Sequence, residues 1–506
     1  MAGDDITVHV EWLARRLAQQ QVDAKATEQH RIMVSNHRVP RVPGHVRDLN
    51  KDAYKPGLVA IGPLHAGDAE YRLRPGNRLK MTYLNSLISR GHPDPTQHLA
   101  VIQGYIRLVA AREQEARAMY AAEDVDNIGA EDFIQMLVLD GCFIIEHLVN
   151  VALGQEEPLL HATPFGPTQL SVDLILAENQ IPFFVLVDLT KSTRLPEFGS
   201  TGYDPPVLLM KLVQYYLAGE KGRDMSERLP AADGVSHILH LLHAMVTAAR
   251  TSWEPPDRIQ DGAVLEMAQE AARLLRRLPL LLLVPLLYPI LPEDRRWGAS
   301  YGREDLASAS DLKRMWVRFK KARGRRTGKA AAGIASVLGP VPLAVKLVHE
   351  DRLRLPQLRI EFRTAPLLLN LVAFEQSSEQ RTGPGDVSAY VWFMTKMVQS
   401  AEDAGVLVAA EVVQSSSAGG SESKEEVARF FRQVGAASEV EEEAEKSYLG
   451  EMLGKLRERS HHPLFMMWAD VQRNYFTVPW AVVAEFVTLI TFISAILQTY
   501  GSFKQK

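Results

Sequence analysis

The residues best suited to chemistry lie around the only cysteine in the chain. Cys142 is flanked by Asp140 and Glu146 in the stretch FIQMLVLDGCFIIEHLV. This arrangement suggests a cysteine nucleophile with acidic partners, and Asp140 with Glu178 would form a general acid–base pair. A reactive cysteine, however, needs an electropositive and partly exposed setting. Because the neighbours of Cys142 are leucine, phenylalanine and isoleucine, the sequence favours a buried structural cysteine and assigns no catalytic residue.

A second polar group, Glu178-Asn179-Gln180, lies inside the apolar stretch 173–187. Buried polar groups must be hydrogen-bonded, and a buried carboxylate needs a cation or several N–H donors. We therefore expect this motif to hold an irregular turn of the chain before Pro182. An arginine from the segment 38–47 is the expected partner of Glu178.

The histidines His237, His240 and His243 are spaced three and six residues apart. Helical zinc pairs use positions i and i+4 on one face, whereas His237 and His243 would point roughly 240° apart. One helix cannot bring all three to one metal, so structural or surface roles are expected. No metal site and no cofactor is predicted. The sequence contains no phosphate-loop, serine-hydrolase, metalloprotease or dinucleotide-binding motif, so no enzyme is predicted.

Composition indicates a folded protein in a reducing compartment. The chain has 506 residues, of which 46% are hydrophobic and 23% charged, and its net charge of −4 does not favour nucleic acid as a partner. A single cysteine cannot form an internal disulfide. The N-terminus has no apolar core of a signal peptide.

The periodicity of apolar residues predicts a mainly α fold: a large helical body with a few short strands and one C-terminal transmembrane helix. Residues 1–30 are expected to form a polar helix, and residues 31–474 the body, with a flexible loop at 415–423. Helices are expected near 80–120, 131–153, 207–217, 236–247 and 387–408, and over parts of 424–459. Residues 355–376 begin with the alternation of a strand and end as a helix. The proline-rich apolar run 278–291 is expected to be buried or packed on the body.

The C-terminal segment Val478–Leu497 is long enough to cross a bilayer. Twenty residues at 1.5 Å each span about 30 Å, the thickness of the hydrocarbon core. The segment carries one charge, Glu485, and begins with Pro479 and Trp480, while Tyr500 lies beyond its other end. Tryptophan and tyrosine are typical of the membrane interface. We expect a transmembrane helix over 478–500, with the body in the cytosol. The alternative is a buried core helix.

The stretch 313–329 is densely basic. A solvated surface is one interpretation. A contact with anionic lipid headgroups is the functional alternative, because each basic side chain near such a surface contributes about 1 kcal/mol. Phosphate binding or nuclear import would also need a basic run, but nucleic acid is not the expected partner. The residues are Lys313, Arg314, Arg318, Lys320, Lys321, Arg323, Arg325, Arg326 and Lys329.

Four ordered motifs resemble a plant family named for its domain of unknown function 247, over roughly residues 30–500. The first comprises Arg38, Pro40, Arg47, Asn50, Tyr54, Pro56 and Ile61-Gly62-Pro63; the second Asp140-Gly141-Cys142 within 139–146; the third Glu178-Asn179-Gln180 with Pro182; and the fourth Asn370, Glu375 and Gln376. Ala401-Glu402-Asp403 and Pro479-Trp480-Ala481 also fit the family. We expect these residues to have structural roles.

The resemblance implies a plant protein with a C-terminal membrane anchor and no known catalytic activity. Some grass members of the family are implicated as male determinants of self-incompatibility, which implies protein–protein recognition at a membrane. The expected function is thus that of a recognition or signalling component that is anchored in the plasma membrane and acts through unknown protein partners. Two alternatives remain: an enzyme with a site near Asp140, Cys142 and Glu178, or a membrane-surface scaffold that uses residues 313–329.

Overall fold

The computed structural model describes most of the body of the chain. It covers residues 39–66, 75–155, 157–158, 160–162, 165–196, 203–219, 229–248, 306–322, 343–348, 351–377, 385–415, 421–436 and 441–475, with the isolated positions Thr491 and Ser494. The expected N-terminal helix at 1–30 and the apolar run 278–291 lie outside the described residues. So does the segment 478–500, apart from Thr491 and Ser494.

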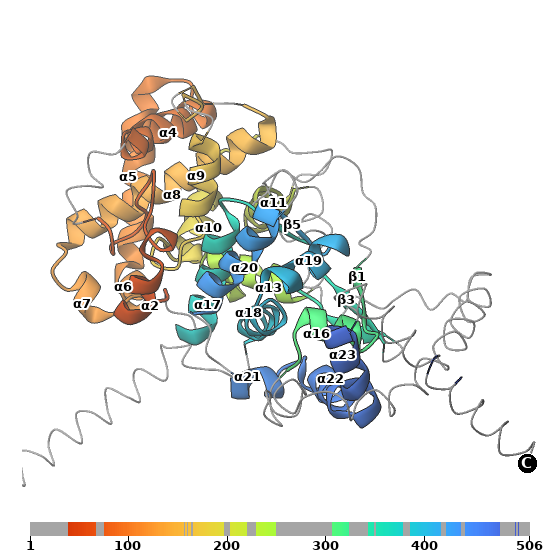
Figure 1. Ribbon diagram of the computed structural model, residues 1–506. Helices are drawn as coiled ribbons and strands as arrows, with labels where there is room; N and C mark the ends of the chain where they lie inside the picture. Colours follow the sequence, from red (N-terminus) through yellow and green to blue (C-terminus); the bar gives the residue numbers. More distant parts are fainter. Residues whose placement is uncertain are drawn as a thin grey trace, which may run out of the picture.

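Helix α8 (Ala130–Leu153) is the centre of the N-terminal half, where a helix was predicted over 131–153. A helix that is apolar nearly all round must be buried on all sides. Four helices pack around α8 (Figure 1): α4 (Pro75–Gly91), α5 (His98–Ala111), α10 (Phe183–Lys191) and α11 (Pro205–Ala218). Among the described helices, α8 is the one long and apolar enough to cross a membrane, and most of it is buried in the protein.

Shorter elements complete this half. They are the 3₁₀ turn η3 (Pro95–Gln97) and the helices α6 (Glu113–Ala118), α7 (Ala122–Val125) and α9 (Gly166–Asp173). Between α9 and α10 the chain is irregular over residues 174–182. Pro182 is the N-cap of α10, so the predicted interruption of this apolar stretch at Pro182 is confirmed.

The C-terminal half contains a second group of packed helices. Its members are α13 (Ile238–Ala248), α16 (Ala309–Arg314), α17 (Thr364–Ser377), α18 (Asp386–Met397), α19 (Ala401–Ala409) and α20 (Ser421–Gly435). The turn η5 (Ala232–Gly234), just before α13, packs on α10 and α11 of the N-terminal half. The single helix predicted over 387–408 is two helices. Val398 leaves the helical conformation, and Ser400 with Asp403 forms a capping box that starts α19.

The loop predicted at 415–423 is shorter than expected. Strand β5 (Val413–Ser415) includes its first residue, and α20 begins at Ser421, so only residues 416–420 connect them and these lie outside the described residues. Ser423, on the first turn of α20, is buried. The helix therefore begins further toward the N-terminus than its charged residues suggest.

Two small sheets accompany these helices. The first has the strand order β1-β3-β2, formed by β1 (Arg318–Lys321), β2 (Lys346–Val348) and β3 (Arg352–Leu355); β1 is parallel and β2 antiparallel to β3. The second pairs β4 (Leu358–Ile360) with β5 in parallel. The prediction that 355–376 passes from strand to helix is confirmed by β4 and α17. A mostly helical body with a few short strands is therefore the observed architecture.

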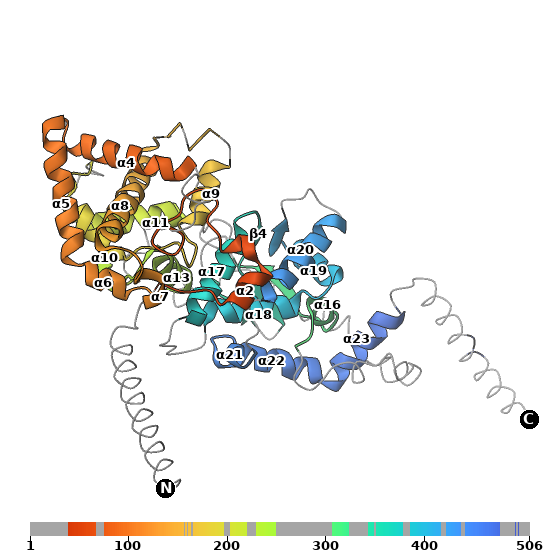
Figure 2. The ribbon, with the colours of Figure 1, turned by 90° about the vertical axis from the view of Figure 1, so that its left-hand side faces the viewer.

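The last three helices of the body are α21 (Glu441–Lys446), α22 (Gly450–His461) and α23 (Pro463–Tyr475). Figure 2 shows α22 and α23 at the opposite end of the molecule from α4 and α5. Helix α23 packs against α16 and α22. The described part of the body therefore ends at Tyr475.

Residues 39–63 run between the two halves, and we call them the N-terminal strap. The strap contains α2 (Gly44–Leu49) and the turn η2 (Lys51–Ala53). It reaches the N-terminal half through Val39, whose N–H donates to the carbonyl of Met119 at 2.8 Å. It reaches the C-terminal half through Asn50, which accepts from Gln433 Nε2 at 2.7 Å.

Candidate functional site

The N-terminal strap is held by buried polar side chains from four different elements. Asp173, the last residue of α9, binds three consecutive backbone amides of the strap. One carboxylate oxygen accepts from Gly57 N at 2.7 Å, and the other from Leu58 N at 2.7 Å and Val59 N at 2.8 Å. Burial raises the pKa of the Asp173 carboxyl, while these hydrogen bonds oppose the rise. Consecutive amides that converge in this way form a binding site for an anion.

The Glu178-Asn179-Gln180 motif continues this arrangement. Asn179 Oδ1 accepts from Ile61 N at 2.7 Å, and its Nδ2 donates to the carbonyl of Val59 at 3.1 Å. Gln180 Nε2 donates to the carbonyls of Leu174 and Leu176, each at 2.9 Å. The two side chains therefore satisfy backbone groups that no helix or sheet satisfies, in the strap and in the turn before Pro182.

Glu178 binds the first part of the strap. Its Oε1 accepts from Val42 N at 2.9 Å and from Arg47 Nη2 at 2.5 Å. The arginine expected from the segment 38–47 is thus Arg47. Glu178 is 3% exposed, so its charge needs these donors.

Asp140 binds the other end of the strap. Its Oδ2 accepts from Gly62 N at 2.8 Å, and Lys80 Nζ lies 2.5 Å from Oδ1. Burial raises the pKa of Asp140, and the Lys80 ammonium opposes this shift. Lys80 also donates to the carbonyl of Ala60 at 2.6 Å. The carboxylate is therefore used to fix the strap on α8.

The structure does not bring Asp140, Cys142 and Glu178 together as partners in its described part. Asp140 and Glu178 bind different ends of the strap, and Cys142 lies about 200° from Asp140 around α8. Cys142 is fully buried, and burial raises the pKa of its thiol well above the ordinary value. Gly141 lies against Leu189 of α10, where a Cβ would come within 2.4 Å of that side chain. Glu146 pairs with Arg90 at 2.5 Å.

Alkylation of Cys142 tests the nucleophile directly, because the chain has no other cysteine. In the native protein we expect iodoacetamide to react at least about 10³-fold more slowly than in the denatured protein, since the thiol is exposed only when the fold opens. Mass spectrometry of timed samples gives both rates. Native modification as fast as that of the denatured chain would instead support a reactive cysteine.

The fourth motif joins the two halves and caps a helix. Asn370 Nδ2 donates to the carbonyl of Ala53 at 2.8 Å, and its Oδ1 accepts from Ala177 N at 2.7 Å. Glu375 accepts from the amides of Val387 and Ser388 at the start of α18. Burial opposes ionisation of Glu375, but hydrogen bonds from His243 and these amides hold its pKa below the ordinary value. Gln376 is half-buried beside it.

His237, the residue before α13, and His240 and His243 of α13 surround one phenylalanine. The ring centroids of His237, His240 and His243 lie 5.5, 5.5 and 5.1 Å from that of Phe374. His243 Nε2 also lies 2.8 Å from Glu375 Oε1. Within the described residues, no three histidine, cysteine or acidic side chains are grouped so that they could hold a metal.

The remaining first-motif and third-motif residues are buried supports, except Arg38, which lies outside the described residues. Pro40, Tyr54, Pro63 and Pro182 are buried. Burial raises the pKa of Tyr54 well above its ordinary value. Sequence reasoning missed Asp173, Lys80 and Arg90 as partners. The one available signal was Asp173 itself, an acidic residue at the edge of an apolar stretch.

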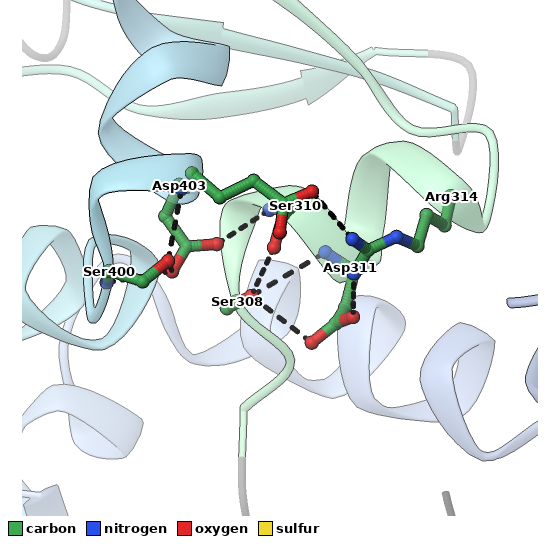
Figure 3. A network of polar contacts seen from close by, with 7 residues as sticks. Ser308, Ser310, Asp311, Arg314, Ser400 and Asp403 are labelled. Atoms are coloured by element: carbon green, nitrogen blue, oxygen red, sulfur yellow. Dashed lines mark hydrogen bonds and ion pairs between the residues drawn. The ribbon is translucent and has the colours of Figure 1, made fainter. Parts of the chain in front are cut away.

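The beginning of the basic stretch is fixed to α19 by a polar network (Figure 3). Ser310 N donates to Asp403 Oδ1 at 2.8 Å, and Arg314 bridges Asp311 at 2.7 Å and Glu402 at 2.5 Å. Burial opposes ionisation of Asp403, but serine hydrogen bonds hold its pKa below the ordinary value. Arg314 is thus occupied within the protein. Residues Arg323, Arg325, Arg326 and Lys329 lie outside the described residues.

Comparison with known proteins agrees with the pattern of motifs. The profile of the family DUF247, described as a plant protein of unknown function, matches residues 39–494. UPF0481 protein At3g47200 of Arabidopsis thaliana is 23% identical over 478 residues, which cover 91% of this chain and 84% of that protein. No solved structure shows a significant match. Because the family profile spans nearly the whole chain, this protein belongs to the plant family DUF247, whose function is unknown.

Proposed function

We propose that this protein is anchored in a membrane by its C-terminal segment and that its helical body recognises protein partners from the cytosolic side of the plasma membrane. The segment Val478–Leu497 carries the proposal, because its twenty residues hold one charge, Glu485. Its Val, Ile, Leu and Phe side chains each favour insertion by about 0.3–0.6 kcal/mol, which together outweighs one acid costing roughly 3 kcal/mol.

The packing of α23 on the body indicates which end of the body would lie nearest an inserted tail. Trp316 contacts Phe465 and Trp468 of α23, with ring centroids 5.8 and 5.6 Å apart. Arg459 lies over the ring of Phe465 at 4.5 Å and donates from Nε to the carbonyl of Met315 at 3.2 Å. An inserted tail would therefore keep this end of the body close to the bilayer.

The use of the motif residues supports a recognition role for the body. Asp140, Glu178 and Asn179 hold the N-terminal strap, and Glu375 caps α18. Because these side chains are bound within the fold, their role is to shape the body. A partner would then recognise the surface of that body. Protein recognition is also what the resemblance to the family implies.

Two arginines in the middle of the segment test the anchor in the full-length chain. Each arginine at the centre of a membrane helix costs roughly 3 kcal/mol, so Val487→Arg with Ile490→Arg should abolish insertion. We expect alkaline carbonate to release this variant from membranes and to leave the unaltered chain in the pellet. Gln498→Arg with Thr499→Arg adds the same charge beyond the segment and should remain in the pellet.

Protease digestion of sealed vesicles then tests the orientation. Digestion of the body from outside supports a cytosolic body, whereas protection of the body would place it on the lumenal or extracellular side. If carbonate releases the unaltered chain as completely as the arginine variant, the anchor is wrong. The segment would then be a core helix.

A further inference from the structure

One face of the sheet β1-β3-β2 gathers basic side chains from three strands. The pairing places Arg318 opposite Arg352, Lys320 opposite Arg354, and Lys346 on the other side of Arg354. Residues paired directly across strands project from the same face of a sheet. We call these five residues the basic sheet face: Arg318, Lys320, Lys346, Arg352 and Arg354.

The opposite face of this sheet belongs to the core. Phe319, Leu353 and Leu355 alternate with the basic residues and are buried. Lys320 is exposed, and the other members of the basic sheet face are half-buried. The alternation therefore fixes the basic side chains on the outer surface.

The arrangement has an electrostatic cost that an anionic surface would remove. Like charges directly opposite one another destabilise a sheet, and this register contains three such pairs. Asp351 offsets part of the charge through a 2.5 Å ion pair with Arg318. A layer of phosphate groups lying over the face would lower this repulsion further.

The basic sheet face lies close to the proposed anchor. Trp316, two residues before Arg318, contacts Trp468 of α23, and β1 is paired with β3. Helix α23 continues from Trp468 to Tyr475, which is about 10 Å of helix. The apolar segment begins at Val478, at most about 10 Å of chain further on.

We infer that the basic sheet face rests on the anionic phospholipid headgroups of the membrane that holds the tail. This inference deepens the proposed function and names the surface by which the body meets the bilayer. The residues of the basic sheet face differ in part from the basic residues that the sequence predicted within 313–329. Arg314 is bound to Asp311 and Glu402, and Lys321 lies on the other side of β1 with Glu411, whereas Lys346, Arg352 and Arg354 come from outside the basic run.

The test uses the full-length chain with the anchor disabled by Val487→Arg and Ile490→Arg, so that insertion does not mask surface binding. We expect it to co-sediment with vesicles of phosphatidylcholine mixed with phosphatidylserine, but not with phosphatidylcholine alone. Lys320→Gln with Lys346→Gln should lower the vesicle partition coefficient about 25-fold, since each basic side chain strengthens such binding roughly fivefold. Lys320→Gln alone, at an exposed position, should lower it about fivefold.

The matched control is Arg78→Gln with Arg107→Gln, which removes the same charge from exposed positions of α4 and α5. It should bind as the parent does. Equal losses in the control and the sheet variant, or no binding to phosphatidylserine vesicles by the parent, would overturn the inference. Binding of an RNA oligonucleotide without vesicle binding would overturn it as well. Failure of the anchor is read separately, from carbonate extraction of the unaltered chain.

Discussion

Replacing Asp173 by alanine is expected to lower the free energy of unfolding by about 3–5 kcal/mol, among the largest effects that a single substitution has in this protein. The carboxylate accepts from the amides of Gly57, Leu58 and Val59. Without it, three N–H groups lose their acceptor, those of Gly57 and Leu58 partly buried and that of Val59 buried. Each such loss costs roughly 1–3 kcal/mol before water partly compensates. Urea unfolding of the full-length chain in mild detergent measures the loss.

Hydrogen exchange locates the effect of Asp173→Ala in the strap. The amides of residues 57–59 should exchange faster in the variant by a larger factor than amides in the middle of α8. Asp126→Ala, at an exposed position after α7, is the matched control and should change stability by less than about 0.5 kcal/mol. A loss below about 1 kcal/mol for Asp173→Ala, with unchanged exchange in the strap, would show that the contact of Asp173 with the strap is not needed for stability.

The helices that were predicted best are those whose apolar pattern is long and continuous. Helix α8 begins one residue before its predicted start, and α11, α13 and α17 lie where periodicity placed them. A helix that is apolar on every side is stable in water only when it is buried, whichever elements pack against it. Such elements can be predicted without knowledge of their neighbours.

Breaks within helical patterns were harder to predict. The chain stops being helical between α18 and α19, although the apolar residues keep a similar spacing through 398–400. Ser400 followed by Asp403 is a capping signature that the sequence does contain. The prediction followed the apolar periodicity instead of this signature. Apolar spacing alone does not distinguish one bent helix from two.

The sequence predicted that the buried polar side chains of the motifs need hydrogen-bonding or charged partners, but mostly not which residues supply them. A buried Glu178 requires a cation, and the nearby arginine-containing segment supplied Arg47. The partners of Asp173 could not be deduced in the same way. They are backbone amides more than a hundred residues away in sequence, and every residue except proline has such an amide. Likewise, the basic run was visible, but the register that adds Arg352, Arg354 and Lys346 to one face was not.

Replacing Gly62 by alanine is expected to lower the free energy of unfolding by about 3 kcal/mol, through two separable effects. Gly62 has a φ of 75°, which costs an alanine about 1–2 kcal/mol. In addition, a Cβ at this position would lie 2.5 Å from the carbonyl oxygen of Gln180. That overpacking adds roughly 1–3 kcal/mol, since the carbonyl belongs to backbone that Gln180 and Tyr120 hold in place.

Gly154 separates the two effects, because it also has a positive φ but lacks the crowding. Its φ is 65°, and a Cβ there would have no neighbour within 4 Å. Gly154→Ala should therefore cost only about 1–2 kcal/mol. The difference between the two variants, measured by urea unfolding, is the steric cost of moving the strap away from Gln180. That movement would also lengthen the hydrogen bond from Gly62 N to Asp140 and so weaken the hold of α8 on the strap. Equal losses in the two variants would mean that the strap can shift freely, and a strap that shifts freely is not the fixed link between the two halves that its contacts describe.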